Sequence, residues 1–138
     1  MSTWQKITSQ KPRLLAWFLR FEAAVETLAF VAVVMPHAWM AIAHRWLGLG
    51  ELPDAPLLDY MIRSVSFLYG LHGVLLWILA TDTVRFRPLI IYAAVSYLAS
   101  AVVFTLIDLR NEMPWWWTAS EVGSVLCYGL LLGWLLRD

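Results

Sequence analysis

The sequence has little of what soluble enzymes and nucleic-acid-binding proteins use. A single cysteine, Cys127, among 138 residues excludes an internal disulfide and leaves no Cys/His cluster for structural zinc. Charged residues make up only 14% of the chain, against roughly a quarter in soluble domains. Ten basic and ten acidic side chains balance, so no charge excess points to nucleic acid. The catalytic patterns GxSxG and HExxH, a phosphate-binding glycine loop and the Glu-x-x-His pattern of di-iron bundles are all absent.

Long apolar stretches take up most of the chain, which is 61% hydrophobic. A helix needs about 20 mostly apolar residues to cross a bilayer. Four stretches meet this requirement, at residues 14–35, 57–80, 88–107 and 115–136. The last three are joined by short links, so consecutive helices are expected to be antiparallel neighbours. The sequence therefore predicts an all-α polytopic membrane protein, with residues 1–138 forming one antiparallel bundle of four transmembrane helices.

The basic residues predict the orientation. One side of the predicted membrane carries Lys6, Lys11, Arg13, Arg85, Arg87 and Arg137, while the other carries only Arg45 and Arg110. Positive charge is retained on the cytoplasmic side, which places both termini there. Trp115, Trp116 and Trp117 then mark the outer interface, where indole rings prefer to lie. The expected location is the inner membrane of a bacterium.

Residues 37–48 have a helical pattern between the first two spans. Trp39, Ile42 and Trp46 share one face, and His37 and His44 share the other. This pattern predicts a short amphipathic helix in the outer interface, with its aromatic face toward lipid. The alternative is a plain connector that contains one amphipathic turn. Without a third ligand, the two histidines are read as surface residues, and no metal site is predicted.

Ionisable residues within the predicted spans are the best sequence pointer to a functional site, because each is costly at that depth. Glu22 and Glu26 share one face of the first span, and Arg63 lies among small residues of the second. Glu121 and Tyr128 share a face of the fourth span. Depth counting at about 1.5 Å per residue predicts an outer-half polar cluster. It comprises Glu26, Arg63 and Glu121, is bordered by Tyr60, Tyr128 and Asp108, and has Glu22 a turn deeper.

Each of these residues also has a plainer interpretation. Arg63 and Glu26 are equally consistent with a structural clamp between helices. Thr118 and Glu121 have the spacing of a capping box, so that Glu121 would serve only to start the fourth helix. His72 falls opposite Arg63 on the second span, so that it either bonds across to a neighbouring helix or lies on a face that contacts another protein. A single membrane histidine does not make a haem site, and no cofactor is predicted.

Two segments carry a resemblance to known proteins. They are Met35-Pro-His-Ala-Trp-Met through Trp46-Leu-Gly-Leu-Gly, and Arg63-Ser-Val-Ser with Leu71-His-Gly-Val-Leu-Leu-Trp77. They resemble small uncharacterised bacterial four-helix membrane proteins, DoxX-like in outline. The resemblance implies a four-helix bundle of a kind that often serves as an accessory subunit or has no assigned activity. A more distant likeness is to the sterol-isomerase-like EXPERA bundle, which places carboxylates in a lipid-accessible cavity, and no catalytic role is transferred from it.

Three functions follow as hypotheses. The preferred one is a small membrane protein whose polar intramembrane pocket binds a lipophilic ligand or packs within an assembly. The second is an accessory subunit of a larger membrane complex, which would have a membrane protein partner or a second copy of the chain. The third is a membrane enzyme that acts on a lipid or isoprenoid, with Glu26 as acid or base. The expected surroundings are the lipid bilayer.

Overall fold

The computed structural model describes the backbone of residues 3–137 and the side chains of residues 11–137. Its regular structure is helical, which confirms the predicted all-α class. The chain forms two compact units, Leu19–Ile78 and residues 1–18 together with 79–138. We name them the Leu19–Ile78 unit and the hairpin unit. The single four-helix domain stays a prediction.

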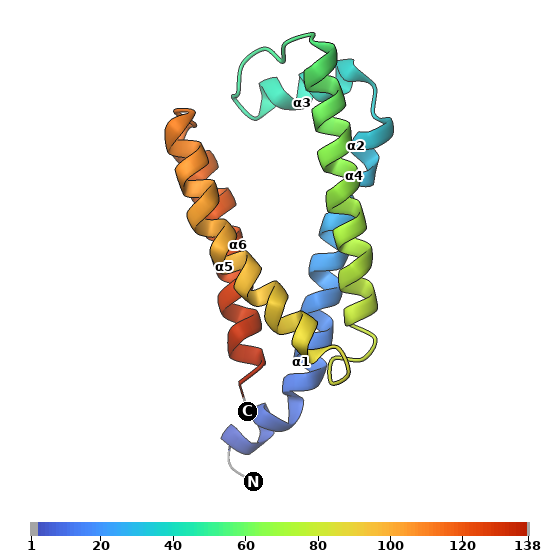
Figure 1. The fold of residues 1–138 in the computed structure, drawn as a ribbon, viewed down its shortest axis with the longest axis vertical. Coiled ribbons are helices and arrows are strands. Elements are labelled where there is room, and N and C mark those ends of the chain that lie inside the picture. Colours follow the sequence, from blue (N-terminus) through green and yellow to red (C-terminus); the bar gives the residue numbers. More distant parts are fainter. Residues whose placement is uncertain (1–2, 138) are drawn as a thin grey trace. The chain divides into compact units, whose positions relative to one another are not determined.

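The helices follow one another along the chain in Figure 1. Their bounds are α1 Thr3–Thr27, α2 Phe30–Val34, α3 His37–Trp46, α4 Pro56–Leu79, α5 Arg87–Arg110 and α6 Trp115–Leu135. By length and composition, α4, α5 and α6 are each able to cross a membrane. They coincide with the second, third and fourth predicted spans to within three residues at every end. The chain therefore has the composition of a multi-pass membrane protein.

The first predicted span, residues 14–35, differs from the expectation of one continuous helix. The structure divides it between α1, which begins upstream at Thr3, and the short α2. Neither helix qualifies as a membrane span by length and composition. The physical reason is that the apolar part of α1 includes Arg20, Glu22 and Glu26, while α2 is too short to cross alone. The four-span bundle is thus not established by the helices themselves.

The break between α1 and α2 has a local cause. The Thr27 hydroxyl donates to the carbonyl of Ala23 at 2.5 Å, a contact that tends to bend helices. Directly after it, the backbone changes to tighter bonds, with the N–H of Ala29 donating to Glu26 and that of Val31 to Leu28. Bonds of this i→i−3 kind tighten the turn and redirect the chain. The first segment of the Leu19–Ile78 unit is therefore kinked.

Two glycines of α4 allow the first segment to approach closely. A Cβ atom on Gly73 would lie 2.7 Å from the backbone nitrogen of Thr27, and one on Gly70 would lie 2.5 Å from the ring of Phe30. Phe30 also packs on Phe67, with ring centroids 5.8 Å apart. The small-residue face of α4 that the sequence predicted does lie against the first segment.

Helix α3 confirms the short helix expected in this region. It ends in a Schellman motif, in which the N–H of Leu49 donates to His44 and that of Gly48 donates to Arg45. Gly48 has the positive φ of 73° that this ending requires. The aromatic face is exposed, with Trp46 at 85%. On the polar face, His44 Nδ1 lies 2.9 Å from the carbonyl oxygen of Gly50.

The hairpin unit is built around α5 and α6, which run side by side as an antiparallel pair (Figure 1). Small residues of α5, Ala93, Ala94 and Ala101, are buried, and Gly129 of α6 packs against Leu98 and Ala94. At the turn, the N–H of Met113 returns to the carbonyl of Asp108. The N-terminal part of α1 joins this unit through Phe18, whose ring lies 5.5 Å from that of Tyr128.

Candidate functional site

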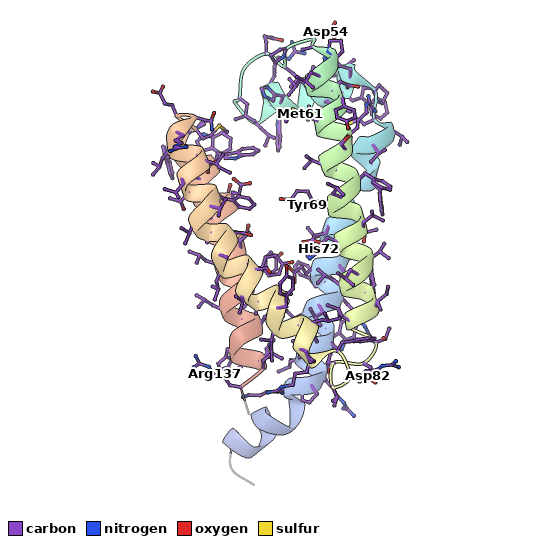
Figure 2. All side chains as sticks on the ribbon, viewed as in Figure 1. Asp54, Met61, Tyr69, His72, Asp82 and Arg137 are labelled. Carbon is purple, nitrogen blue, oxygen red and sulfur yellow. The ribbon has the colours of Figure 1, made fainter. Side chains whose placement is uncertain are left out.

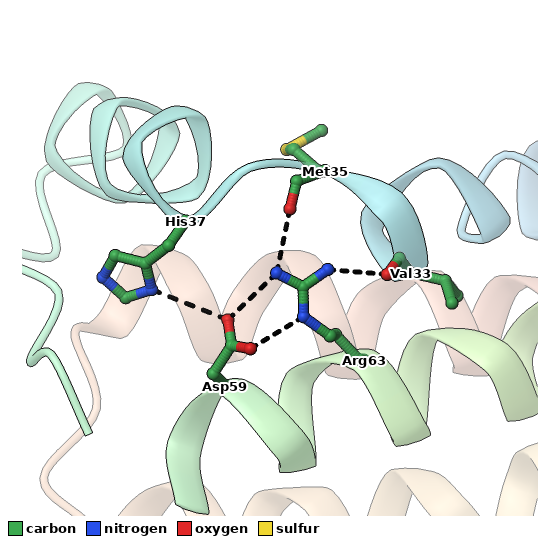
Figure 3. A network of polar contacts seen from close by, with 5 residues as sticks. All are labelled: Val33, Met35, His37, Asp59 and Arg63. Carbon is green, nitrogen blue, oxygen red and sulfur yellow. Dashed lines mark hydrogen bonds and ion pairs between the residues drawn. The ribbon is translucent and has the colours of Figure 1, made fainter. Parts of the chain in front are cut away.

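Arg63 is the centre of a polar network in the Leu19–Ile78 unit (Figure 3). Its Nε donates to Asp59 Oδ2 at 2.7 Å, and its Nη2 donates to Asp59 Oδ1 at 3.2 Å. Nη1 donates to the carbonyl of Val33 at 2.6 Å, and Nη2 donates to that of Met35 at 3.0 Å. His37 Nδ1 lies 3.6 Å from Asp59 Oδ1. One guanidinium therefore connects α4, the end of α2 and, through Asp59, the start of α3.

The network exists because α2 ends within an apolar segment. The last carbonyls of a helix have no partner inside the helix, and in an apolar layer each unsatisfied one costs free energy. Pro36 has no N–H and holds Met35 in an extended conformation, with ψ 133°, so the helix cannot continue. Arg63 supplies the missing donors, and Asp59, one turn away on α4, balances its charge. The first role of Arg63 is therefore to cap the C-terminal end of α2.

A groove lies beside Arg63. It has a volume of about 350 Å³ and is lined by Val33, Arg63, Ser64, Phe67 and Leu68. Four of the five guanidinium N–H groups donate to the oxygens described above. The remaining N–H, on Nη1, has no acceptor among the described residues. The groove thus joins an apolar wall to the polar side chains of Arg63 and Ser64.

A second polar pair in the same unit connects α1 to α4. Glu26 Oε2 lies 2.5 Å from His72 Nδ1. The Glu26 side chain is 14% exposed and the His72 side chain 39%, and His72 is labelled in Figure 2. Glu22, which is buried at 1% exposure, also interacts electrostatically with His72. Two carboxylates of α1 therefore interact with one imidazole of α4, a helix that is long and apolar enough to cross a membrane.

The structure pairs the predicted residues differently from the expected bridge. Arg63 bonds to Asp59 and to two carbonyls, while Glu26 contacts His72. Depth counting assumed a straight first span, and it did not anticipate that a break would expose carbonyls in need of a donor. The contact with Glu26 agrees with the alternative that His72 bonds across to a neighbouring helix, and a protein partner on this face stays a prediction. Asp59 was missed as a site residue, although its i, i+4 spacing to Arg63 was a usable signal.

Glu121 and Tyr128 lie on α6, in the hairpin unit. Glu121 interacts electrostatically with the buried Asp108 and forms a side-chain hydrogen bond with Trp117. Tyr128 packs against Phe18, as described above, and against Tyr97 with centroids 5.9 Å apart. The convergence of Glu121 and Tyr128 with Glu22, Glu26 and Arg63 stays a prediction.

The capping-box interpretation of Glu121 is wrong. Helix α6 begins at Trp115, with Pro114 at the N-cap and no side-chain cap. Thr118 therefore lies within the first turns of the helix and is not its cap. Glu121 therefore does not cap the helix. The groups that interact with its carboxyl group are Asp108 and Trp117.

Among residues 3–137, no group of three or more His, Cys, Asp or Glu side chains is placed to hold a metal ion. No family model matches the chain. No curated protein and no solved structure matches it either. The DoxX-like resemblance carried by the first two predicted spans gains no support from these comparisons. The molecule is established as an all-helical protein with three long apolar helices.

Proposed function

We propose that the protein is a four-span membrane protein that holds a lipophilic molecule in the groove beside Arg63. The observation that carries this proposal is the groove itself. Val33, Phe67 and Leu68 give it an apolar wall, and Arg63 supplies one N–H that the fold does not use. Small-molecule sites combine these two features, a largely apolar surface and a few placed polar groups.

The fourth crossing would consist of the apolar part of α1 together with α2. Residues 14–34 amount to about 30 Å at the helical rise, which matches the hydrocarbon thickness. The free-energy cost of placing Glu26 in the membrane is reduced, because its carboxyl group is paired with His72. With four crossings, both termini lie on one side, and the excess of basic residues assigns them to the cytoplasm.

Reporter fusions test this topology. A reporter that is active only in the cytoplasm is fused before Met1, and in a second protein it is inserted after Gly50. With four spans, the first fusion is active and the second is inactive. Equal activity of the two fusions would mean that residues 14–34 do not cross.

The occupant of the groove is expected to be a lipid with an acyl or isoprenoid chain and a polar group that accepts a hydrogen bond. The lining residues of α4 lie on a helix long and apolar enough to cross a membrane, so that lipid is the molecule present at the highest concentration. Arg63 is already neutralised by Asp59. A hydroxyl or carbonyl group therefore suits the remaining N–H as well as an anion does.

Native mass spectrometry of the protein extracted with its surrounding lipid tests the groove. Leu68→Trp fills the groove with a larger side chain, and Leu71→Trp is the matched control because Leu71 is exposed on the same helix and does not line the groove. The parent and Leu71→Trp should retain a bound lipophile that Leu68→Trp loses. Identical lipid content in all three proteins would contradict the proposal. A co-purifying protein would instead favour the accessory-subunit hypothesis.

A membrane enzyme is the second candidate, and the contact between Glu26 and His72 is the observation that favours it. A carboxylate that orients an imidazole is a common arrangement for general acid–base catalysis. The test is to incubate the protein in nanodiscs with a membrane lipid extract and to search for new lipid species by mass spectrometry. An enzyme should lose its product with Glu26→Gln and with His72→Gln. A product that persists in both variants would exclude this pair.

A further inference from the structure

Cationic side chains gather where α6 ends in the hairpin unit. Lys11 Nζ donates to the carbonyl oxygen of Arg137 at 2.5 Å. Arg87 Nη2 donates to the carbonyl oxygen of Leu136 at 2.7 Å. The last carbonyls of a helix carry partial negative charge, so these two cations cap the C-terminus of α6. As a result, residues from α1, from the start of α5 and from the end of α6 meet at one place.

Two more arginines lie close to these two cations along the chain. Arg13 follows Lys11 on α1 within one turn, and Arg85 precedes Arg87 by two residues. Figure 2 labels Arg137 and Asp82 toward the same end of the hairpin unit. The basic cluster comprises Lys11, Arg13, Arg85, Arg87 and Arg137. Among the described residues at this end, Asp82 is the acidic one, and its carboxylate accepts a bond from the backbone N–H of Arg85; Asp138 lies outside them. The cluster therefore carries a net positive charge.

Lys11 and Arg87 cap the end of α6, whereas the side chains of the other three cations do not. Arg13, Arg85 and Arg137 are exposed. Among the described residues, no hydrogen bond or ion pair engages the guanidinium of Arg13 or Arg137, and that of Arg85 lies over the ring of Phe86, 5.6 Å from its centroid. Guanidinium groups that remain available in this way are well suited to a phosphate, which they can bind through two parallel hydrogen bonds.

Apolar side chains border the cluster directly. Lys11 Nζ lies 5.7 Å from the centroid of the Trp134 ring. Leu14 follows Arg13, Val84 precedes Arg85, and both are exposed. A ligand that fills both surfaces has a negative head and an apolar tail. A basic cluster immediately beside a membrane span is also the usual sequence feature of anionic-lipid binding.

We propose that the basic cluster at the end of α6 binds the phosphate headgroup of an anionic phospholipid. Lys11 and Arg87 hold α6 in place, while Arg13, Arg85 and Arg137 contact the phosphate. This site shares no residue with the groove beside Arg63. It depends only on the hairpin unit lying in a membrane, so that either site can exist without the other.

Native mass spectrometry in the presence of equal amounts of phosphatidylglycerol and phosphatidylcholine tests the proposal. The test variant is Arg13→Gln with Arg137→Gln, which leaves both residues that cap α6 intact. The control is Arg45→Gln with Arg110→Gln, which removes the same charge from exposed arginines outside the cluster. The parent and the control should prefer phosphatidylglycerol. The test variant should lose this preference by about five-fold for each arginine at low ionic strength.

Three results would overturn the proposal. An equal loss in both variants would mean that only the total charge matters. Displacement of phosphatidylglycerol by inorganic phosphate, but not by sodium chloride of equal ionic strength, would mean that the cluster recognises free phosphate. Leu68→Trp should leave the lipid preference unchanged, so that a failure of the groove and a failure of this site are distinguishable. Raising the salt concentration should weaken the preference through screening, and an unchanged preference would contradict an electrostatic site.

Discussion

The Leu19–Ile78 unit and the hairpin unit use different means to hold apolar helices together. In the first, a kinked segment leaves the carbonyls of Val33 and Met35 at a helix end, and Arg63 satisfies them. In the second, α5 and α6 are continuous, so that between their ends the backbone bonds are satisfied internally, and small residues form the contact. The comparison teaches that polar side chains are required where an apolar helix is interrupted. Where it continues, close packing is sufficient.

Glycine shows the same difference on a smaller scale. A Cβ atom on Gly73 would meet backbone atoms of Thr27 and Ala23, which cannot move without moving the first segment. A Cβ atom on Gly129 would meet mainly the flexible end of Leu98. The two units should therefore respond unequally to one added methyl group.

The largest effect is expected for Gly73→Ala. The added methyl group would overlap with backbone, so we expect a loss of about 2–3 kcal/mol in the free energy of unfolding. Titration of the protein in mixed micelles with dodecyl sulfate, followed by circular dichroism, measures this. A variant as stable as the parent would mean that the first segment moves freely on α4, and the proposed contrast between the units would fail.

A double-mutant cycle tests how the polar pairs of the Leu19–Ile78 unit are arranged. Combining Glu26→Gln with His72→Gln should give a coupling energy of about 1 kcal/mol, because the two groups are in contact and His72 is partly exposed. The matched cycle combines Glu26→Gln with Arg63→Met and should give no measurable coupling. Coupling between Glu26 and Arg63, with none between Glu26 and His72, would instead support the bridge between Glu26 and Arg63 that the sequence predicted.

Gly129→Ala examines the hairpin unit. Leu98 can change its rotamer to admit the methyl group, while the carbonyl oxygen of Ala94, 3.1 Å from the new Cβ atom, resists it. We expect a loss of about 1 kcal/mol in the same unfolding titration. A loss equal to that of Gly73→Ala would mean that both units are equally rigid at their glycine contacts.

The smallest effect is expected for Gly133→Ala. Among the described residues, no atom beyond the adjoining residues and the nearby backbone of α6 lies within 4 Å of a Cβ atom at this position. Alanine loses less conformational freedom than glycine in a helix, so a gain of about 0.5 kcal/mol is expected. A destabilised variant would reveal a contact on this face and would favour packing against a partner or a second copy of the chain.

Much of the fold was predictable because apolar length is encoded locally. The helices α4, α5 and α6 follow from runs of apolar residues that begin near Pro56, Pro88 and Pro114. The ending of α3 at Gly48 was also readable, since a residue with positive φ favours glycine. The glycine face of α4 was visible from its spacing. Each of these features depends on neighbours within a few turns of the chain.

The partners in the polar site were not predictable in the same way. Arg63 and Glu26 were singled out because charged residues are costly in an apolar segment, and both do form polar contacts. Which groups they contact depends on the bend after Thr27, which decides the direction of α2 and the position of its last carbonyls. A helical wheel drawn for a straight span has no information about such a bend.

The sequence by itself determined that the chain is helical, where its three long apolar helices lie, and which ionisable residues would need partners. Only the tertiary structure decided that Arg63 caps a broken helix with Asp59 beside it, and that His72 contacts Glu26. The physical reason is range. Helix length and termination depend on residues close together along the chain, whereas a polar partner depends on how separate segments meet in space.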